Sequence, residues 1–117
     1  MSDPKPTAAF TAELIEAIAE GISVVDETGR PILVNEAFCA MTGYSRQELM
    51  ACEPLQYPYW PPEERDAIVA AFERMRAGDF GPYALVFSRK DGQRFPCSVA
   101  PGKATIAGQP MYLAVVE

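Results

Sequence analysis

The sequence predicts an α+β domain with an antiparallel sheet, and three observations support this prediction. The first third has a helical pattern followed by two short strand-like segments. The middle third has helix signals interrupted by prolines, and the last third consists of three strand-like runs separated by turn residues. At 117 residues, the chain can form one core that buries about two-thirds of its unfolded surface. We therefore expect one domain.

The first expected element is an amphipathic helix over residues 10–20, after a flexible lead at residues 1–9. The apolar residues of this helix recur at helical spacing: Phe10, Leu14, Ile15 and Ile18. Gly21 is expected to end the helix, because glycine readily adopts the left-handed conformation that follows a last turn. A helix of about three turns needs a partner surface to persist.

Two short strands and two short helices are expected next. The strands are rich in β-branched residues and lie at Ile22–Val25 and Ile32–Val34. Asn35 can cap the first helix, because its side-chain oxygen reaches free N–H groups of the first turn, and Gly43 ends that helix. Ser45 and Glu48 have the spacing of a capping box and begin the second helix.

The segment from residue 51 to residue 62 is dense in prolines and aromatic residues, which predicts a structured loop. Tyr57, Tyr59 and Trp60 can line a ligand cleft or form a partner-binding patch. We favour the simpler interpretation that they close the core beneath the helix that follows. Pro61-Pro62 leads into that long helix, which is expected to end at Gly78.

Three strand-like runs complete the chain: YALVFSRK, RFPCSVAP and PMYLAVVE. Asp91-Gly92 between the first two is a strong hairpin signal. The last run is apolar on both faces, whereas a sheet that is wet on one side would alternate apolar and polar residues. A second layer must therefore cover the outer face. The helix at residues 10–20 is the available lid, for its own sheet or for the sheet of a partner.

Composition excludes several classes of function. The net charge is −6 and the basic residues do not cluster, which argues against nucleic acid and anionic membranes as partners. No apolar run approaches the roughly 20 residues that span a bilayer. Three cysteines without CxxC spacing, Cys39, Cys52 and Cys97, fit a reducing cytoplasm. The chain has no histidine, so it lacks the commonest metal ligand and general base, and no metal site is expected.

Three motifs in order resemble those of PAS domains, the sensory domains of bacterial signalling proteins. They are ILVNEAFCAMTGYSRQELM, VFSRKDGQRFPCSVAP and MYLAVVE. The resemblance covers residues 11–117 and places a PAS core at residues 21–117 within a domain at residues 10–117. It implies a five-stranded antiparallel sheet with short helices and one long helix on its inner face.

The resemblance implies a cytoplasmic sensory module of a signal-transduction protein, such as a two-component system, and no enzyme activity. The expected output domain is a kinase, cyclase, phosphatase or transcription regulator. The close carboxylate pairs Glu63-Glu64 and Asp26-Glu27 fit a helix start and a turn, so they do not indicate catalysis.

Two versions of this function stay open. In the first, a small molecule binds between the inner sheet face and the helices. The expected lining is Phe38, Met41, Leu49, Tyr57, Phe72, Phe87, Phe95 and Cys97. In the second, side chains fill the core and the domain works as a homodimeric interaction module. The expected interface is Phe10, Leu14, Ile15, Ile18, Tyr112 and Ala114. No charged residue falls at an evident pocket position, which favours the second version or an apolar ligand.

No cofactor is expected. The haem-binding PAS type needs an axial histidine, which is absent. The flavin-binding LOV type carries a reactive cysteine between an Asn and an Arg, but Cys52 lies between Ala51 and Glu53. A glutamate there would repel the flavin phosphate. Cys39 is expected to be a passive apolar filler, and Cys97 is expected to belong to the core or the pocket lining rather than to act as a nucleophile. A flavin- or haem-binding photo-, redox or gas sensor is the most distant alternative.

Overall fold

A computed structural model describes residues 8–117 of the protein, with side chains described from Glu13 onward. The predicted lead at residues 1–9 lies outside the described residues except for Ala8 and Ala9, which begin a helix. The side chain of Phe10, one of the predicted interface residues, also lies outside the described part.

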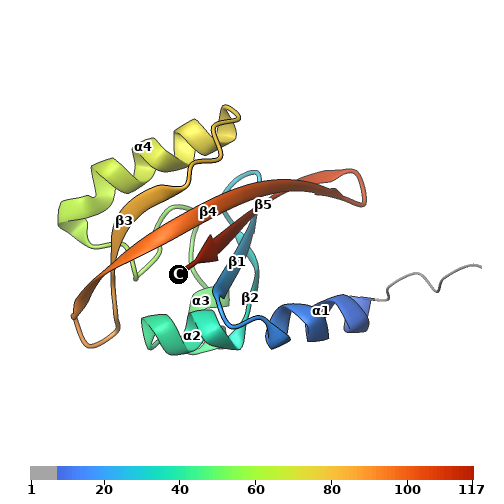
Figure 1. Ribbon diagram of the computed structural model, residues 1–117, viewed down its shortest axis with the longest axis horizontal. Coiled ribbons are helices and arrows are strands. Elements are labelled where there is room, and N and C mark those ends of the chain that lie inside the picture. The colour runs from blue at the N-terminus through green and yellow to red at the C-terminus, as the bar shows by residue number, and fades with distance from the viewer. Residues whose placement is uncertain (1–7) are drawn as a thin grey trace, which may run out of the picture.

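One sheet of five antiparallel strands forms the centre of the domain, as predicted (Figure 1). The strands are β1 (Gly21–Asp26), β2 (Pro31–Val34), β3 (Tyr83–Ser88), β4 (Arg94–Ile106) and β5 (Gln109–Val116). Their order is β2-β1-β5-β4-β3, so the last strand lies in the middle of the sheet beside the first. The expected apolar character of β5 on both faces follows from this central position.

Four α-helices and one short 3₁₀ turn surround the sheet. They are α1 (Ala8–Ala17), α2 (Glu36–Thr42), α3 (Arg46–Met50), η1 (Pro62–Glu64) and α4 (Arg65–Arg76). Both predicted caps are present, because Asn35 Oδ1 accepts a bond from Phe38 N and Ser45 forms a reciprocal capping box with Glu48. Gly43 ends α2 in the left-handed conformation at a φ of 79°.

The predicted end of the first helix is wrong. Helix α1 ends at Ala17, and Gly21 is the first residue of β1 rather than a helix cap. A Cβ atom on Gly21 would lie 3.0 Å from Phe38 Cδ1 and 3.2 Å from Phe38 Cα. Glycine is favoured here because β1 begins in close contact with α2, and a larger residue would require Phe38 to shift.

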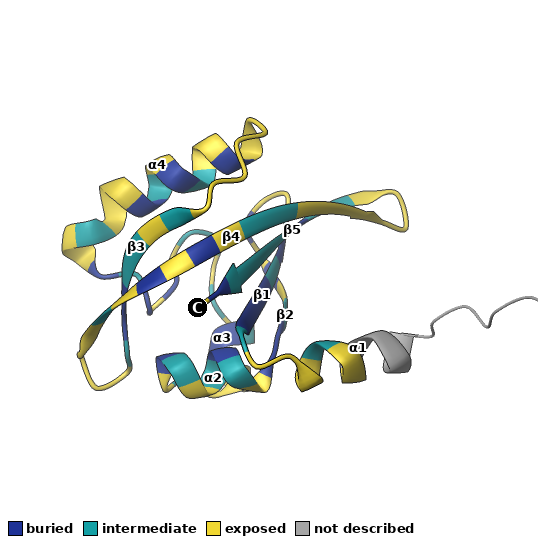
Figure 2. Ribbon diagram, viewed as in Figure 1, coloured by how far each residue is buried: buried dark blue, intermediate teal, exposed yellow. Residues whose placement is uncertain are grey.

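The two faces of the sheet have different surroundings. Helix α4 covers the inner face and buries the side turned toward the sheet (Figure 2). The buried inner side chains include Val25, Phe87, Cys97, Val99, Tyr112 and Val116. On the outer face, Val24 and Val115 are only half-buried.

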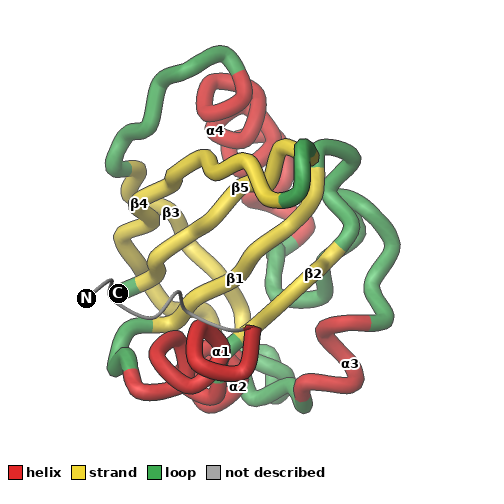
Figure 3. The backbone as a smooth tube through the Cα atoms, turned by 90° about the vertical axis from the view of Figure 1, so that its right-hand side faces the viewer, coloured by secondary structure: helices red, strands yellow, loops and turns green. Residues whose placement is uncertain are grey.

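Helix α1 does not lie across its own sheet. Figures 1 and 3 show it beside α2 and pointing away from the body of the domain, on the opposite side of the molecule from α4. Leu14 and Ile18 of this segment are 53% and 40% exposed. Of the two lids that the sequence left open, the cover of its own sheet is therefore wrong.

Candidate functional site

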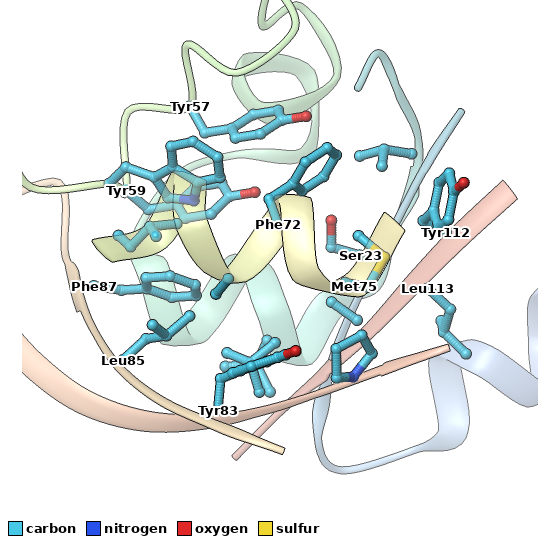
Figure 4. A pocket seen from close by; sticks show the side chains of 18 of the residues that line it. Ser23, Tyr57, Tyr59, Phe72, Met75, Tyr83, Leu85, Phe87, Tyr112 and Leu113 are labelled. Carbon is cyan, nitrogen blue, oxygen red and sulfur yellow. The ribbon is translucent and has the colours of Figure 1, made fainter. Parts of the chain in front are cut away.

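A cavity of about 90 Å³ lies between the inner sheet face, helix α4 and the proline-rich loop before it (Figure 4). Residues from seven parts of the chain line it, including Val99 from β4 and Val116 from β5. Ser23 comes from β1, Phe38 from α2, Tyr59 from the loop, Met75 from α4 and Phe87 from β3. The cavity is therefore the space that remains where the predicted inner layer packs on the sheet.

Half of the predicted lining residues reach this cavity: Phe38, Tyr57, Phe72 and Phe87. The other four pack elsewhere in the core. Leu49 is buried on α3, and the Cys97 sulfur lies 3.6 Å from the Leu85 carbonyl oxygen. Met41 and Phe95 are partly buried and pack against the core without lining the cavity. The prediction is wrong for these four, because burial on the inner side does not place a side chain at the gap.

Two predicted interface residues, Tyr112 and Ala114, belong to the cavity instead. Both line it from β5, and Tyr112 is only 8% exposed. The pairing of Ser23 with Ala114 and of Val25 with Tyr112 places them on the inner face. Their assignment to an outer interface is therefore wrong by one strand position, which reverses the face of every side chain.

A cluster of aromatic rings forms the loop side of the cavity. Tyr59 lies at its centre, with ring centroids 5.0 Å from Phe38, 5.2 Å from Phe87 and 5.5 Å from Tyr57. The Tyr57 ring also meets the edge of Trp60 at 4.8 Å. Edge-to-face and offset pairs of this kind add to the burial of the rings. The loop therefore closes the core and lines the cavity with the same side chains.

No residue that lines the cavity carries a formal charge. Tyr59 contributes a buried hydroxyl to the lining. Burial raises the pKa of Tyr59 well above its usual value, and the Ser23 hydroxyl lowers it only in part. The Tyr57 hydroxyl donates a hydrogen bond to the Gly29 carbonyl oxygen, and burial raises the pKa of Tyr57 to about 12. These hydroxyls are therefore neutral near pH 7 and can form a hydrogen bond with a ligand.

The cysteines are outside the cavity lining and are poor nucleophiles. Burial raises the pKa of the Cys97 thiol to about 11, and it also raises the pKa values of Cys39 and Cys52. A nucleophilic or flavin-reactive cysteine requires the thiolate, which a raised pKa disfavours.

The cations around the cavity are engaged elsewhere. Arg65 lies over the Trp60 ring, with its Cζ atom 5.9 Å from the ring centroid, and donates to the Leu55 carbonyl oxygen at 2.7 Å. Arg74 pairs with Asp79 at 2.8 Å. Within residues 8–117, no group of three or more Cys, Asp or Glu side chains is arranged to hold a metal ion. No helix in the same range is long and apolar enough to cross a membrane.

Comparison with known families agrees with this architecture. The family model described as PAS domain matches residues 19–115 of the chain. The chain belongs to the PAS domain family. The sensory role that the sequence implies fits this membership, and PAS domains are in general sensory modules rather than catalytic ones.

The C4-dicarboxylate transport sensor protein DctS of Rhodobacter capsulatus is a relative of this PAS domain. The two are 29% identical over 103 residues, which is 86% of this chain and 15% of the relative. The chain therefore spans only a small part of the length of that protein.

Solved PAS structures share the fold. A PAS domain from a two-component sensor histidine kinase is 20% identical, with a TM-score of 0.77 over 93% of both chains. A PAS domain from Colwellia psychrerythraea is 15% identical, with a TM-score of 0.78 over 92% of both chains. The LOV protein of Rhodobacter sphaeroides is 14% identical, with a TM-score of 0.74 over 91% of this chain and 62% of that one. At these identities, the likeness concerns the fold alone.

Proposed function

We propose that this PAS domain is the sensory part of a signalling protein and that its inner cavity binds a small, uncharged and largely apolar molecule. The observation that supports this most directly is the lining, which has hydroxyl groups but no charged side chain. An ionised ligand would lose its hydration without gaining an ion pair, at a cost of several kcal/mol. A neutral ligand avoids this cost.

A C4-dicarboxylate does not suit this cavity, although the relative from Rhodobacter capsulatus is named for that class of compound. Two carboxylates would require cationic side chains or several free N–H donors. The nearby Arg65 and Arg74 are bonded to groups outside the lining. We therefore propose that this domain responds to a different chemical class.

The size of the cavity limits the ligand further. An engineered apolar cavity of about 150 Å³ holds benzene or xenon, and this one is about 90 Å³. It suits a molecule of a few heavy atoms, with one polar group directed at Tyr59 or Ser23. Haem and flavin are far larger than this space, so we propose that the domain uses neither. We also propose that it has no catalytic activity.

Amide NMR spectra under xenon, and separately with succinate, test the proposed ligand class. Xenon is expected to shift the signals of cavity residues such as Ser23 and Tyr59, whereas succinate is not. The variant Ala71→Leu fills the cavity from α4 and should abolish the xenon shifts. The variant Ala70→Leu, on the exposed neighbouring position, should preserve them. Shifts of cavity residues with succinate and none with xenon would overturn the proposal.

The outer surface supports a second role as a homodimeric interaction module. Leu14 and Ile18 are exposed, and Val24 and Val115 leave an apolar outer sheet face half-buried. We propose that α1 of one copy covers the outer face of a second copy, and that the dimer controls an output domain. The two-component sensor histidine kinase among the proteins of similar fold supports a kinase output. The three unpaired cysteines support a cytoplasmic location.

A further inference from the structure

The side chain of Asn35 joins three elements at one buried point. It is fully buried, and its Oδ1 accepts bonds from Ile22 N at 2.8 Å and Phe38 N at 3.0 Å. Its Nδ2 lies 3.0–3.4 Å from three carbonyl oxygens. One belongs to Ile15 in the last turn of α1, and the others belong to Ile18 and Glu20, which follow the helix. Asn35 therefore caps the start of α2 and also donates to the last turn of α1, at Ile15, and to the segment that follows this helix. The Ile15 oxygen accepts a second bond from Ile18 N at 3.2 Å.

Only a carboxamide can make both sets of bonds, because it has an acceptor oxygen and two N–H donors on one side chain. Serine or aspartate would cap α2 equally well, but an aspartate could not donate to the α1 carbonyls. Asn35 is the only asparagine of the chain. The carboxamide of Asn35 is thus required for the attachment of α1, whereas the cap of α2 alone does not require it.

A surface ion pair reinforces the same attachment. The Glu16 carboxylate of α1 pairs with Arg46 of α3 at 2.5 Å and accepts a bond from Glu36 N at 3.1 Å. The Arg46 Nε atom also donates to the Val34 carbonyl oxygen at 3.3 Å. We call Asn35, Glu16 and Arg46 the α1 joint.

The α1 joint is in direct contact with the cavity through Phe38. The backbone N–H of Phe38 bonds to Asn35, while its ring lines the cavity against Tyr59. The other side of Phe38 touches Gly21, where an added methyl carbon would lie only 3.0 Å from Phe38 Cδ1 and would require Phe38 to shift. Because the interior is closely packed, a ligand that displaces the Phe38 ring must also displace the start of α2 and the groups bonded to it.

We infer that the α1 joint relays the filling of the cavity to helix α1. This inference rests on the proposed function, since it requires a ligand in the cavity. Helix α1 is the element that responds, because it points away from the body of the domain (Figures 1 and 3) and the α1 joint bonds it to α2 and α3. Filling of the cavity weakens the bonds to the α1 carbonyls and frees the helix to change its direction.

Amide hydrogen exchange measured by NMR tests the attachment without any ligand. Asn35→Asp keeps the cap of α2, but it loses both donors and places a negative charge at the negative end of α1. Exchange of the α1 amides is expected to rise about tenfold, which corresponds to the loss of about 1.4 kcal/mol. Gln47→Glu adds the same charge on the exposed side of α3 and should leave α1 unchanged. Equal exchange in the two variants would overturn the inference.

A milder pair of variants covers the case in which Asn35→Asp does not fold. Glu16→Gln removes the ion pair to Arg46, and Glu13→Gln makes the same charge change on the same helix. Glu13 has no ion pair within the described part of the chain. Exchange of the α1 amides should rise about twofold in Glu16→Gln only, as expected for an exposed pair. The same exchange rate in both variants would argue against the α1 joint.

Xenon spectra then separate failure of the relay from failure of the proposed ligand site. In the unmodified protein, cavity residues and the amides of residues 14–18 should shift together. In Glu16→Gln, the cavity residues should still shift, with a smaller change in α1. Shifts confined to the cavity would overturn the relay and leave the proposed function intact. Absence of any cavity shift would overturn the proposed function and the relay together.

Discussion

The inner and outer faces of the sheet are built from the same strands, yet they end in different surroundings. On β5, Val116 is 1% exposed beneath the helical layer, whereas its neighbour Val115 is half-buried on the open side. Both are valines in a central strand. The difference shows that composition makes both faces apolar, while the position of the helices decides which face becomes a core and which remains available for a partner.

The largest expected effect is on the inner face. Phe38→Ala removes a fully buried ring that contacts Tyr59 and the start of β1. We expect the free energy of unfolding to fall by about 4 kcal/mol, the usual cost of removing a buried aromatic ring. Urea unfolding measures this change. Val24→Ala on the outer face is the control and should cost about 0.5 kcal/mol; equal losses would contradict the assignment of the two faces.

The two valines of β5 give a more closely matched comparison. Val116→Ala should lower the free energy of unfolding by about 2 kcal/mol, from two lost methyl groups and the cavity they leave. Val115→Ala should lower it by about 0.5 kcal/mol under conditions where the protein is monomeric, because its side chain is already partly in water. Thermal unfolding of both variants at low concentration checks the ratio, and a larger loss for Val115→Ala would reverse our assignment.

The outer face is expected to contribute to association rather than to folding. Leu14→Glu places a charge on the exposed side of α1 and should weaken self-association at least about tenfold, or 1.4 kcal/mol. Sedimentation at tens of micromolar protein, roughly the scale of a modest interface, measures the effect. Ala77→Glu, after the end of α4, is the charge control. A wild-type protein that is monomeric at this concentration would refute the proposed dimer.

The smallest expected effect is the dependence of stability on pH, which also differs between core and surface. Burial raises the pKa of Cys97 from 9.0 to about 11. The neutral thiol therefore contributes fully to the free energy of unfolding below pH 9, and this contribution is lost as the pH rises through 11. Bonds from Lys90 and Ser45 lower the pKa of the exposed Glu48 from 4.5 to about 2. The ionised Glu48 carboxylate therefore stabilises the folded state above pH 4.5, and this stabilisation is lost as the pH falls through 2.

Unfolding in urea at a series of pH values checks both limits. Cys97→Ala should flatten the alkaline decline between pH 9 and 11 and leave the acid limit unchanged. Glu48→Gln should flatten the acid decline alone. If Cys97→Ala left the alkaline decline as steep as before, the buried thiol would not be its cause.

Local signals in the sequence predicted the fold well. Asn35, Gly43 and the Ser45–Glu48 capping box act over a single helical turn, so their meaning is visible in a few residues. The Asp91-Gly92 turn lies between β3 and β4 as expected. The three motifs that resemble PAS domains add their order along the chain, and the family comparison confirmed the identification.

The cavity was predicted less well, because its lining depends on the register of the strands. The alternation in β5 separates two sets of residues but does not say which set faces inward, so Tyr112 and Ala114 were placed on the wrong face. Pairing with β1 decides this, and that pairing joins residues about 90 positions apart. Ser23 was missed for the same reason, since only its contact with Tyr59 gives it a role.

The sequence by itself determined the family, the order of the elements and the caps, because these depend on spacing within short segments. Only the tertiary structure decided that Gly21 packs against Phe38, that the aromatic loop lines an uncharged cavity, and that Asn35 also holds α1. Asn35 illustrates the limit well. Its cap on α2 spans three residues, whereas its bonds to α1 reach back 15 to 20 residues and exist only once β1 and β2 have paired.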